Sequence, residues 1–186
     1  MNEVLIETRL TTGQSLQLVQ GDITEETSDA IVNAANAYLE GGAGVAGAIL
    51  HRGGAELQRQ SAEWVEKHGP VQHDSPAWTS GGNLPCRFVI HAVGPVWGDG
   101  DEASKLAAAV RGSLRLAENL QATSLSLPAI STGIYGFPKD QAADIHLATL
   151  RTFFTGPTTL QVVRVVLFDT PTAEAFVKAW HDHIRP

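Results

Sequence analysis

The feature of this sequence that most constrains its fold is the alternation of short apolar runs with longer amphipathic stretches. Six runs are typical of β-strands, at residues 3–10, 15–20, 30–34, 87–93, 124–127 and 161–168. Four longer stretches have helical spacing: about 45–67 with a break at Gly53-Gly54, 101–121, 139–154, and a last one opened by Pro171. This order predicts an α/β fold, with helices on both faces of a mixed, largely parallel, six-stranded sheet.

The length and composition suit one domain over residues 1–186. A chain of 186 residues with 43% hydrophobic and 18% charged residues is large enough to bury a two-sided core. Glu3, Glu7 and Arg9 interrupt the first apolar runs, so we expect no signal peptide, and no stretch is long and apolar enough for a membrane span. We therefore expect a cytoplasmic protein without a membrane partner.

The cysteine count and the charge exclude several kinds of site. The single cysteine, Cys86, rules out an intrachain disulfide and a multi-cysteine zinc site. His181 and His183 stand two residues apart in the last predicted helix, where their side chains do not face each other, so we expect no metal there. With 13 Lys+Arg against 20 Asp+Glu, the net charge of −7 argues against general nucleic-acid binding. An anionic ligand would have to bind to backbone amides and helix N-termini, which the 18 glycines would allow.

The segment GDIT, residues 21–24, directly follows a predicted strand. The carboxylate of Asp22 can accept a hydrogen bond from the exocyclic amino group of a purine. The alternative is a plain helix cap, in which Asp22 or Thr24 starts a helical turn.

A second segment combines asparagines with a glycine cluster, in NAAN at 33–36 and GGAGVAG at 41–47. Residues 42–47 match G-x-G-x-x-G, which raises a Rossmann dinucleotide site, but that motif should follow a strand immediately, and Tyr38-Leu39-Glu40 intervene. A glycine-rich helix entrance for a phosphate or ribose stays possible, as does a tightly packed turn.

Two further segments follow predicted strands near the C-terminus. STGIYG, residues 131–136, has two glycines that free the backbone to curl its amides around an anion, with hydroxyls from Ser131 and Thr132 and a ring from Tyr135. Phe168 ends the last strand, where it could stack on a purine or simply belong to the core. The remaining candidate, His91, is expected to be a packed, hydrogen-bonded strand residue.

In this order, the segments GDIT, IVNAAN, GGAGV, HAVGP and STGIYG resemble the macrodomain family across nearly the whole chain. The resemblance implies a three-layer α/β/α sandwich with ADP-ribose in a cleft along the C-terminal edge of the sheet. It assigns Asp22 and Ile23 to adenine, with Phe168 stacked on the ring. It assigns the diphosphate to Gly42, Ala43, Gly44 and Val45 and to Ser131, Thr132, Gly133, Ile134 and Tyr135. Asn36 and Tyr135 would hold the distal ribose, and Asn33 would support the loop.

The same resemblance implies a hydrolase that releases ADP-ribose from acidic side chains of mono-ADP-ribosylated proteins, or deacylates O-acetyl-ADP-ribose, without a cofactor. Asn36, Gly133 and Tyr135 would form its catalytic site, with a water activated by the phosphate of the substrate. The best-known hydrolase branch has an aspartate where this chain has Ala46, whose surroundings resemble another branch. The alternatives are a non-catalytic reader of ADP-ribosylated proteins and an NAD-dependent oxidoreductase. We expect a monomer.

Overall fold

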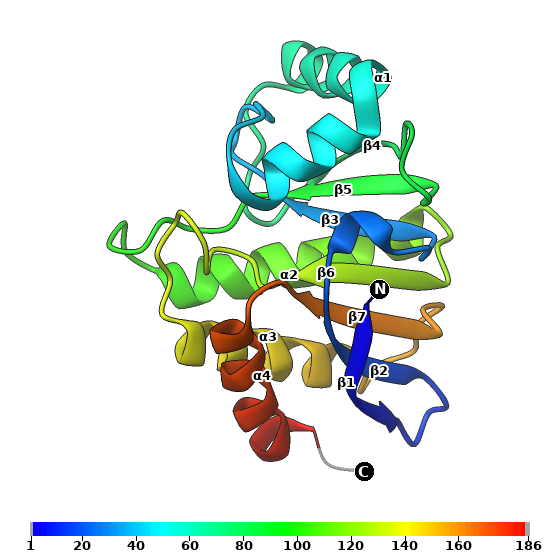
Figure 1. The fold of residues 1–186 in the computed structure, drawn as a ribbon, viewed down its shortest axis with the longest axis vertical. Helices are drawn as coiled ribbons and strands as arrows, with labels where there is room; N and C mark the ends of the chain where they lie inside the picture. Colours follow the sequence, from blue (N-terminus) through cyan, green and yellow to red (C-terminus); the bar gives the residue numbers. More distant parts are fainter. Residues whose placement is uncertain (1, 185–186) are drawn as a thin grey trace.

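The computed structural model describes residues 2–184, and the strands in this range form one seven-stranded sheet in the order β1-β2-β7-β6-β3-β5-β4 (Figure 1). The strands are β1 (Glu3–Arg9), β2 (Ser15–Gln20), β3 (Ala30–Ala34), β4 (Ala77–Ser80), β5 (Phe88–Ala92), β6 (Ser124–Pro128) and β7 (Val162–Leu167). The two edge strands, β1 and β4, run antiparallel to their neighbours, and all inner pairs are parallel. The predicted mixed, largely parallel sheet is confirmed.

The predicted number of strands was too low by one, because no clear strand pattern marks β4. This strand has only four residues, and it follows an isolated bridge between Gln72 and Ser75. Its register against β5 pairs Ala77 with His91 and Ser80 with Phe88. Ser75-Pro76 before it and Gly81-Gly82 after it are typical of loops, so pairing with β5 in the folded chain defines this strand.

The helices are α1 (Gly44–His68), α2 (Glu102–Asn119), α3 (Lys139–Phe153), α4 (Thr170–His183) and the short 3-10 helix η1 (Ile23–Glu25). The predicted break is confirmed inside α1, where Gly54 has the non-helical angles φ 79° and ψ −171°. Pro171 lies in the first turn of α4, as predicted. Over residues 2–184, no helix has the length and apolar character needed to cross a membrane.

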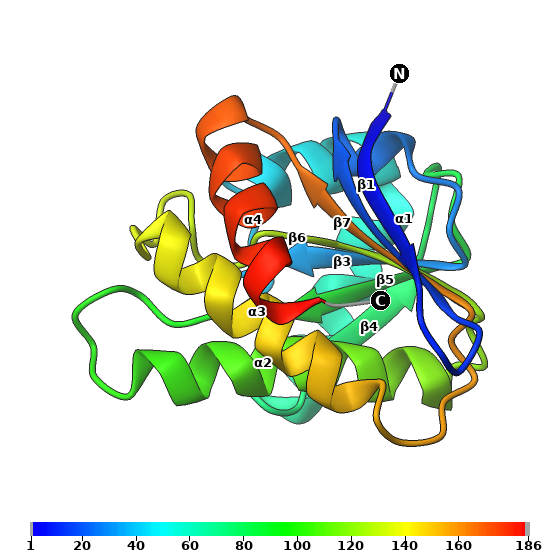
Figure 2. The same cartoon turned by 90° about the horizontal axis from the view of Figure 1, so that it is seen from below.

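Consecutive strand residues face opposite sides of the sheet, and both sides are buried. Leu18, Val32, Ile90 and Val165 belong to the larger core cluster, whereas their neighbours Val19, Ile31, Val89 and Val166 belong to a second cluster. The larger cluster includes residues of α2, α3 and α4, and the second includes Ile49, Leu50 and Leu57 of α1. Figure 2 shows these two helical layers on either side of the sheet, which confirms the three-layer sandwich.

The parallel strands β2, β7, β6, β3 and β5 all end at the same edge of the sheet. The connections that follow β3, β5 and β6 therefore lie together at one end of the molecule (Figure 1). In open α/β sheets, ligands bind outside the carboxyl ends of the strands. This edge is where the predicted site residues should meet.

Candidate functional site

A cleft of about 510 Å³ opens at the carboxyl edge of the parallel strands, a volume within the usual range for small-molecule sites. Every residue that the family resemblance assigned to the site lines it: Asp22, Ile23, Asn36, Gly42, Ala43, Gly44, Val45, Ser131, Thr132, Gly133, Ile134, Tyr135 and Phe168. The fold thus brings together segments separated by more than a hundred positions. Their assembly in one cleft follows from the parallel order of the strands.

Asp22 is both a helix cap and a cleft residue. Its Oδ1 accepts hydrogen bonds from the Thr24 backbone N–H at 2.9 Å and the Thr24 hydroxyl at 2.6 Å, which starts η1. The predicted cap is therefore confirmed. The other oxygen, Oδ2, lies 3.4 Å from Nη2 of Arg52 on α1. The two carboxylate oxygens thus have separate partners, and only Oδ1 is committed to the cap.

The glycine cluster forms the entrance to α1. Residues 35–43 separate β3 from α1, so the immediate strand-to-helix turn of a Rossmann site is absent from this connection. Gly44 has φ +68°, a conformation that side chains disfavour, and a Cβ on Gly47 would lie 2.2 Å from the carbonyl oxygen of Gly42. Ala43, the N-cap residue, makes no side-chain capping bond. The first amides of α1 therefore remain available to an anion in the cleft.

The loop at 131–136 presents consecutive backbone donors. Within residues 2–184, the amide N–H groups of Gly133, Ile134 and Tyr135 donate to no protein acceptor, while the Gly136 and Phe137 N–H groups close the loop on the carbonyls of Gly133 and Ser131, each at 3.0 Å. Such a run of free amides is an anion-binding nest.

Ser131 adds a polar group to this loop that has no protein partner. It adopts φ +70°, and its Oγ is buried without a hydrogen-bond partner in the part of the chain that the structure describes. Three other buried polar atoms there share this property, on Asn33, Ser61 and His183, but only Ser131 lines the cleft. A ligand oxygen would satisfy this hydroxyl.

A buried histidine that sequence reasoning missed supports this loop from behind. His146, on α3, accepts a hydrogen bond at Nε2 from the Ile130 N–H at 3.1 Å, and its Nδ1 donates to the Ala142 carbonyl at 2.7 Å. Burial lowers the pKa of His146 to about 4, so the ring is neutral and Nε2 stays an acceptor. Its position in the middle of a helix gave no sign of this contact.

Asn36, predicted to hold the distal ribose, mainly braces its own loop. Its Oδ1 accepts the N–H groups of Tyr38 at 3.0 Å and Glu40 at 3.1 Å, and its Nδ2 donates to the Glu40 carbonyl at 3.2 Å. A side-chain amide has two N–H donors, so one remains for a ligand. Asn36 can therefore fix the loop and contact a ligand at once.

The two aromatic site residues differ in their surroundings. Phe168 is 77% exposed at the end of β7, so the core interpretation is wrong and its ring is available for stacking. Burial raises the pKa of Tyr135, which keeps the phenol neutral, and its ring contributes packing surface to the cleft.

The polar strand residues near the cleft have structural partners. His91 is fully buried, with Nε2 3.0 Å from the Thr79 hydroxyl and Nδ1 3.1 Å from the Asn33 amide nitrogen, and burial lowers its pKa to about 3. Asn33 thus contacts β5, and the predicted support of the loop is wrong. His183 bonds to Asp144 on α3 at 3.0 Å. Among residues 2–184, no group of three or more His, Cys, Asp or Glu could hold a metal ion.

The electrostatics of the cleft rest on backbone dipoles. Of its lining residues none is Lys or Arg, and its charged members are Asp22, Glu40 and Asp169. The sequence did not assign Glu40 or Asp169 to the site, although Asp169 directly follows Phe168, and it gave no signal for Arg52. An anion in this cleft would be held by amides at the α1 entrance and the 131–136 loop.

Comparison with known proteins agrees with this geometry. The family model described as "Macro domain" matches residues 32–146. A macro domain-containing protein of Cupriavidus necator is 45% identical over 84% of this chain and 92% of its own. The structure of the Oceanobacillus iheyensis macrodomain with ADP superimposes with a TM-score of 0.91 at 36% identity, over 98% of this chain and 97% of that one. The Trypanosoma brucei macrodomain in complex with ADP-ribose gives 0.80 at 34% identity, over 88% and 68%. With the sheet order, the amide-lined cleft and these matches together, the chain belongs to the macrodomain family.

Proposed function

We propose that this macrodomain binds ADP-ribose and hydrolyses the bond that joins ADP-ribose to acidic side chains of proteins. The observation that carries the proposal is that two sets of free backbone amides lie at one cleft. One set belongs to Gly133, Ile134 and Tyr135, and the other to the uncapped start of α1. The lining of this cleft has no Lys or Arg. A diphosphate needs donors of this kind in a chain with a net charge of −7. Two structurally similar macrodomains were solved with ADP and with ADP-ribose.

The ligand would extend along the cleft with adenine near η1. Asp22 Oδ2 would accept a hydrogen bond from the adenine amino group, the Ile23 backbone would bond the ring, and Phe168 would stack on it. The amides of residues 42–45 and 131–135 would surround the diphosphate, and the Ser131 hydroxyl would gain a partner. Asn36 and Tyr135 would then lie at the distal ribose.

The hydrolytic step would need no side-chain base. A water molecule between the diphosphate and the distal ribose would attack C1″, while the bond from C1″ to the ester oxygen breaks and the protein carboxylate leaves with the electron pair. A phosphate oxygen of the substrate would take the proton of the water. The 131–136 loop, with Gly133 and Tyr135, and the free Asn36 donor would fix this geometry, which is where positioning contributes to the rate. The same step applied to ADP-ribose that carries its acetyl group on O1″ would break the bond from C1″ to the ester oxygen and release acetate.

A single-turnover assay tests this function. Excess enzyme is mixed with a protein that carries ADP-ribose on Asp or Glu, and released ADP-ribose is measured against buffer alone. We expect release well above the buffer rate. Release at the uncatalysed rate, together with calorimetric binding of free ADP-ribose, would refute hydrolysis while keeping the binding function. Preferential binding of NAD(H) over ADP-ribose in the same calorimeter would contradict both.

The alternative function is a non-catalytic reader of ADP-ribosylated proteins, and one observation favours it. Ala46, in the first turn of α1, lines the cleft and brings no carboxylate to it. Both functions require binding, so affinity does not separate them. The single-turnover rate does, because a reader binds the modified protein and leaves the linkage intact.

A further inference from the structure

Two exposed apolar residues, Val96 and Trp97, lie next to the proposed distal ribose position, and we call them the distal shelf. The Trp97 N–H donates to the carbonyl of Tyr135 at 2.9 Å, and its ring packs on Phe137 with centroids 4.9 Å apart. Even so, Trp97 is 45% exposed and Val96 is 41% exposed. The shelf is therefore attached directly to the loop that carries Tyr135.

The segment that carries the shelf is held in place by its own hydrogen bonds. The Glu102 carboxylate accepts the N–H groups of Gly98 at 2.8 Å and Gly100 at 3.1 Å, and Lys105 Nζ donates to the Gly100 carbonyl at 2.6 Å. Backbone N–H groups, first its own and then those of Gly100 and Gly98, keep the pKa of Glu102 below its ordinary value. An apolar surface that is both exposed and fixed in position is typical of an interaction site.

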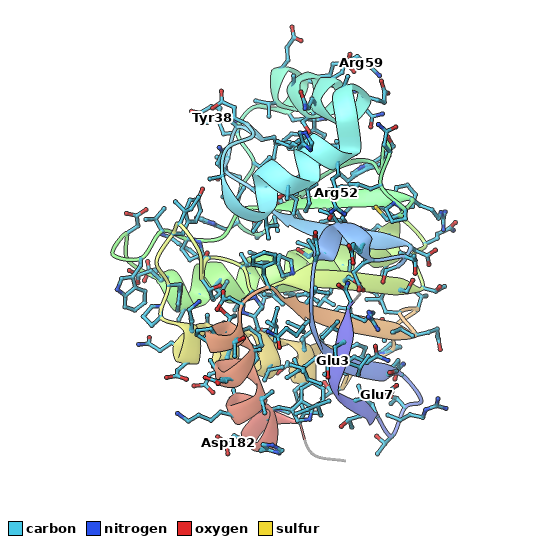
Figure 3. All side chains as sticks on the ribbon, viewed as in Figure 1. Glu3, Glu7, Tyr38, Arg52, Arg59 and Asp182 are labelled. Carbon is cyan, nitrogen blue, oxygen red and sulfur yellow. The ribbon has the colours of Figure 1, made fainter. Side chains whose placement is uncertain are left out.

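The loop between β3 and α1, which carries Asn36, also has an exposed aromatic residue, and we call this loop the Tyr38 bank of the cleft. Tyr38 is 59% exposed, and its N–H donates to Asn36 Oδ1 at 3.0 Å. Figure 3 shows Tyr38 projecting outward from the loop between β3 and α1. Each of the two residues assigned to the distal ribose, Asn36 and Tyr135, is thus bonded to a residue with a solvent-exposed aromatic side chain.

The charges around this end of the cleft are negative. Glu40 lies on the Tyr38 bank, and Asp99 and Asp101 lie on the bank of the distal shelf, all three exposed. The neighbouring cation, Lys105, donates to the Gly100 carbonyl and keeps its charge, but Glu102 adds a further carboxylate to this segment, so the local charge stays negative. This charge disfavours a nucleic acid and favours a polypeptide with Lys or Arg near the point of attachment.

We propose that the distal shelf and Tyr38 dock the polypeptide segment that flanks an ADP-ribosylated side chain, with a preference for basic residues beside the modified position. This proposal rests on the proposed binding of ADP-ribose. A polypeptide attached at the distal ribose would leave the cleft between Trp97 and Tyr38. The aliphatic parts of its Lys and Arg side chains can pack on these two rings, and their cationic groups can lie over the ring faces.

The experiment compares free ADP-ribose with a peptide that carries ADP-ribose through a non-hydrolysable linkage and has lysines on both sides. For Trp97→Ala, we expect the Kd for free ADP-ribose to stay within about twofold and the Kd for the peptide to rise about fivefold or more. Tyr38→Ala should act in the same direction, and it leaves the Trp97 contact with Phe137 intact. A peptide flanked by glutamates should bind the wild-type protein more weakly, and added salt should reduce the difference.

Trp78→Ala is the matched control. Trp78 is 44% exposed and packs edge-on against Phe88 at 5.7 Å, but it lies on β4, away from the lining of the cleft. Trp78→Ala should bind both free ADP-ribose and the peptide with the affinity of the wild type. If Trp97→Ala weakens the binding of free ADP-ribose and of the peptide equally, Trp97 acts only by supporting the loop, and the docking proposal is overturned. Unchanged peptide binding in both Trp97→Ala and Tyr38→Ala would overturn it as well. If the wild type fails to bind free ADP-ribose, the proposed function itself is wrong, and the docking proposal falls with it.

Discussion

At the scale of single residues, Asp22 combines two uses of one carboxylate that the sequence presented as alternatives. Oδ1 caps η1 through Thr24, while Oδ2 lies at the cleft beside Arg52. A carboxylate has enough lone pairs for both. Local sequence could not decide between a cap and a ligand contact, because both need an acceptor at the same position.

Substitutions of Asp22 should separate these two uses. Asp22→Asn keeps an amide oxygen for the cap but offers an N–H to the adenine amino group, so two donors would face each other. We expect both Asp22→Asn and Asp22→Ala to weaken ADP-ribose binding by roughly 1–3 kcal/mol in calorimetry. Only Asp22→Ala should also lower the free energy of unfolding, by about 1 kcal/mol. Wild-type affinity in Asp22→Asn would remove this residue from the adenine site.

Gly44 should reveal the charge of the ligand. Both Gly44→Gln and Gly44→Glu carry the strain of φ +68° and similar bulk, but only glutamate adds negative charge beside the proposed diphosphate. We expect Gly44→Glu to bind ADP-ribose about tenfold more weakly than Gly44→Gln at low salt, with the difference falling as salt rises. Gly69 supplies the control, because it also has a positive φ (+78°) and open space at its Cβ but lies outside the cleft lining; Gly69→Gln and Gly69→Glu should bind ADP-ribose alike. Equal affinities of Gly44→Gln and Gly44→Glu would contradict a phosphate at this entrance.

At the scale of elements, the shape of the cleft depends on a contact between a helix and a loop that lines the cleft. His146 of α3 holds the Ile130 N–H immediately before Ser131, whose backbone has the disfavoured φ of +70°. Its ring also packs edge-on against Phe176 of α4, with centroids 5.4 Å apart. The position of the 131–136 loop therefore depends on how the helical layer packs.

Replacing His146 with phenylalanine should keep an aromatic ring at this position and remove the acceptor. The buried Ile130 N–H would lose its partner, so we expect the free energy of unfolding to fall by about 1–3 kcal/mol and ADP-ribose binding to weaken. Urea unfolding and calorimetry would measure the two effects. His183→Phe, which breaks a bond between α4 and α3 outside the cleft lining, should affect stability alone. Unchanged affinity in His146→Phe would show that the loop keeps its shape without this bond.

At the scale of the whole molecule, the two fully buried histidines link stability to pH. Burial lowers the pKa of His91 to about 3 and that of His146 to about 4, against about 6.5 in an unfolded chain. Below pH 6.5 the unfolded chain therefore binds more protons than the folded one. The free energy of unfolding is at its full value above this pH and is lost as the pH falls toward 4.

Urea unfolding between pH 7.5 and 4.5 should show this loss, with a slope approaching about 1.4 kcal/mol per pH unit for each histidine. His146→Phe should be less stable at pH 7.5 but should lose less on acidification, since one titrating group is gone. Glu26 and Asp29 affect stability at lower pH. Burial raises the pKa of Glu26, but its hydrogen bonds, with Arg164 among the partners, outweigh burial and keep this pKa low. Hydrogen bonds from Thr123 likewise outweigh burial and keep the pKa of Asp29 low. Constant stability down to pH 4.5 would contradict the buried, neutral state of the histidines.

The sequence by itself determined the order of the predicted strands and helices, the break at Gly53-Gly54 and the glycine-rich and polar segments that follow the strands, because these follow from local periodicity, glycine placement and turn chemistry. That these segments form one site was implied by their resemblance to the macrodomain family, and the structure brings them together in the cleft. Only the tertiary structure decided the fourth strand in chain order, the pairing of Asp22 with Arg52, the bond from His146 to Ile130 and the exposure of Phe168 and Trp97. These features join residues that are far apart in the chain. They depend on which strands become neighbours and how the helices pack on them, and no local pattern encodes that.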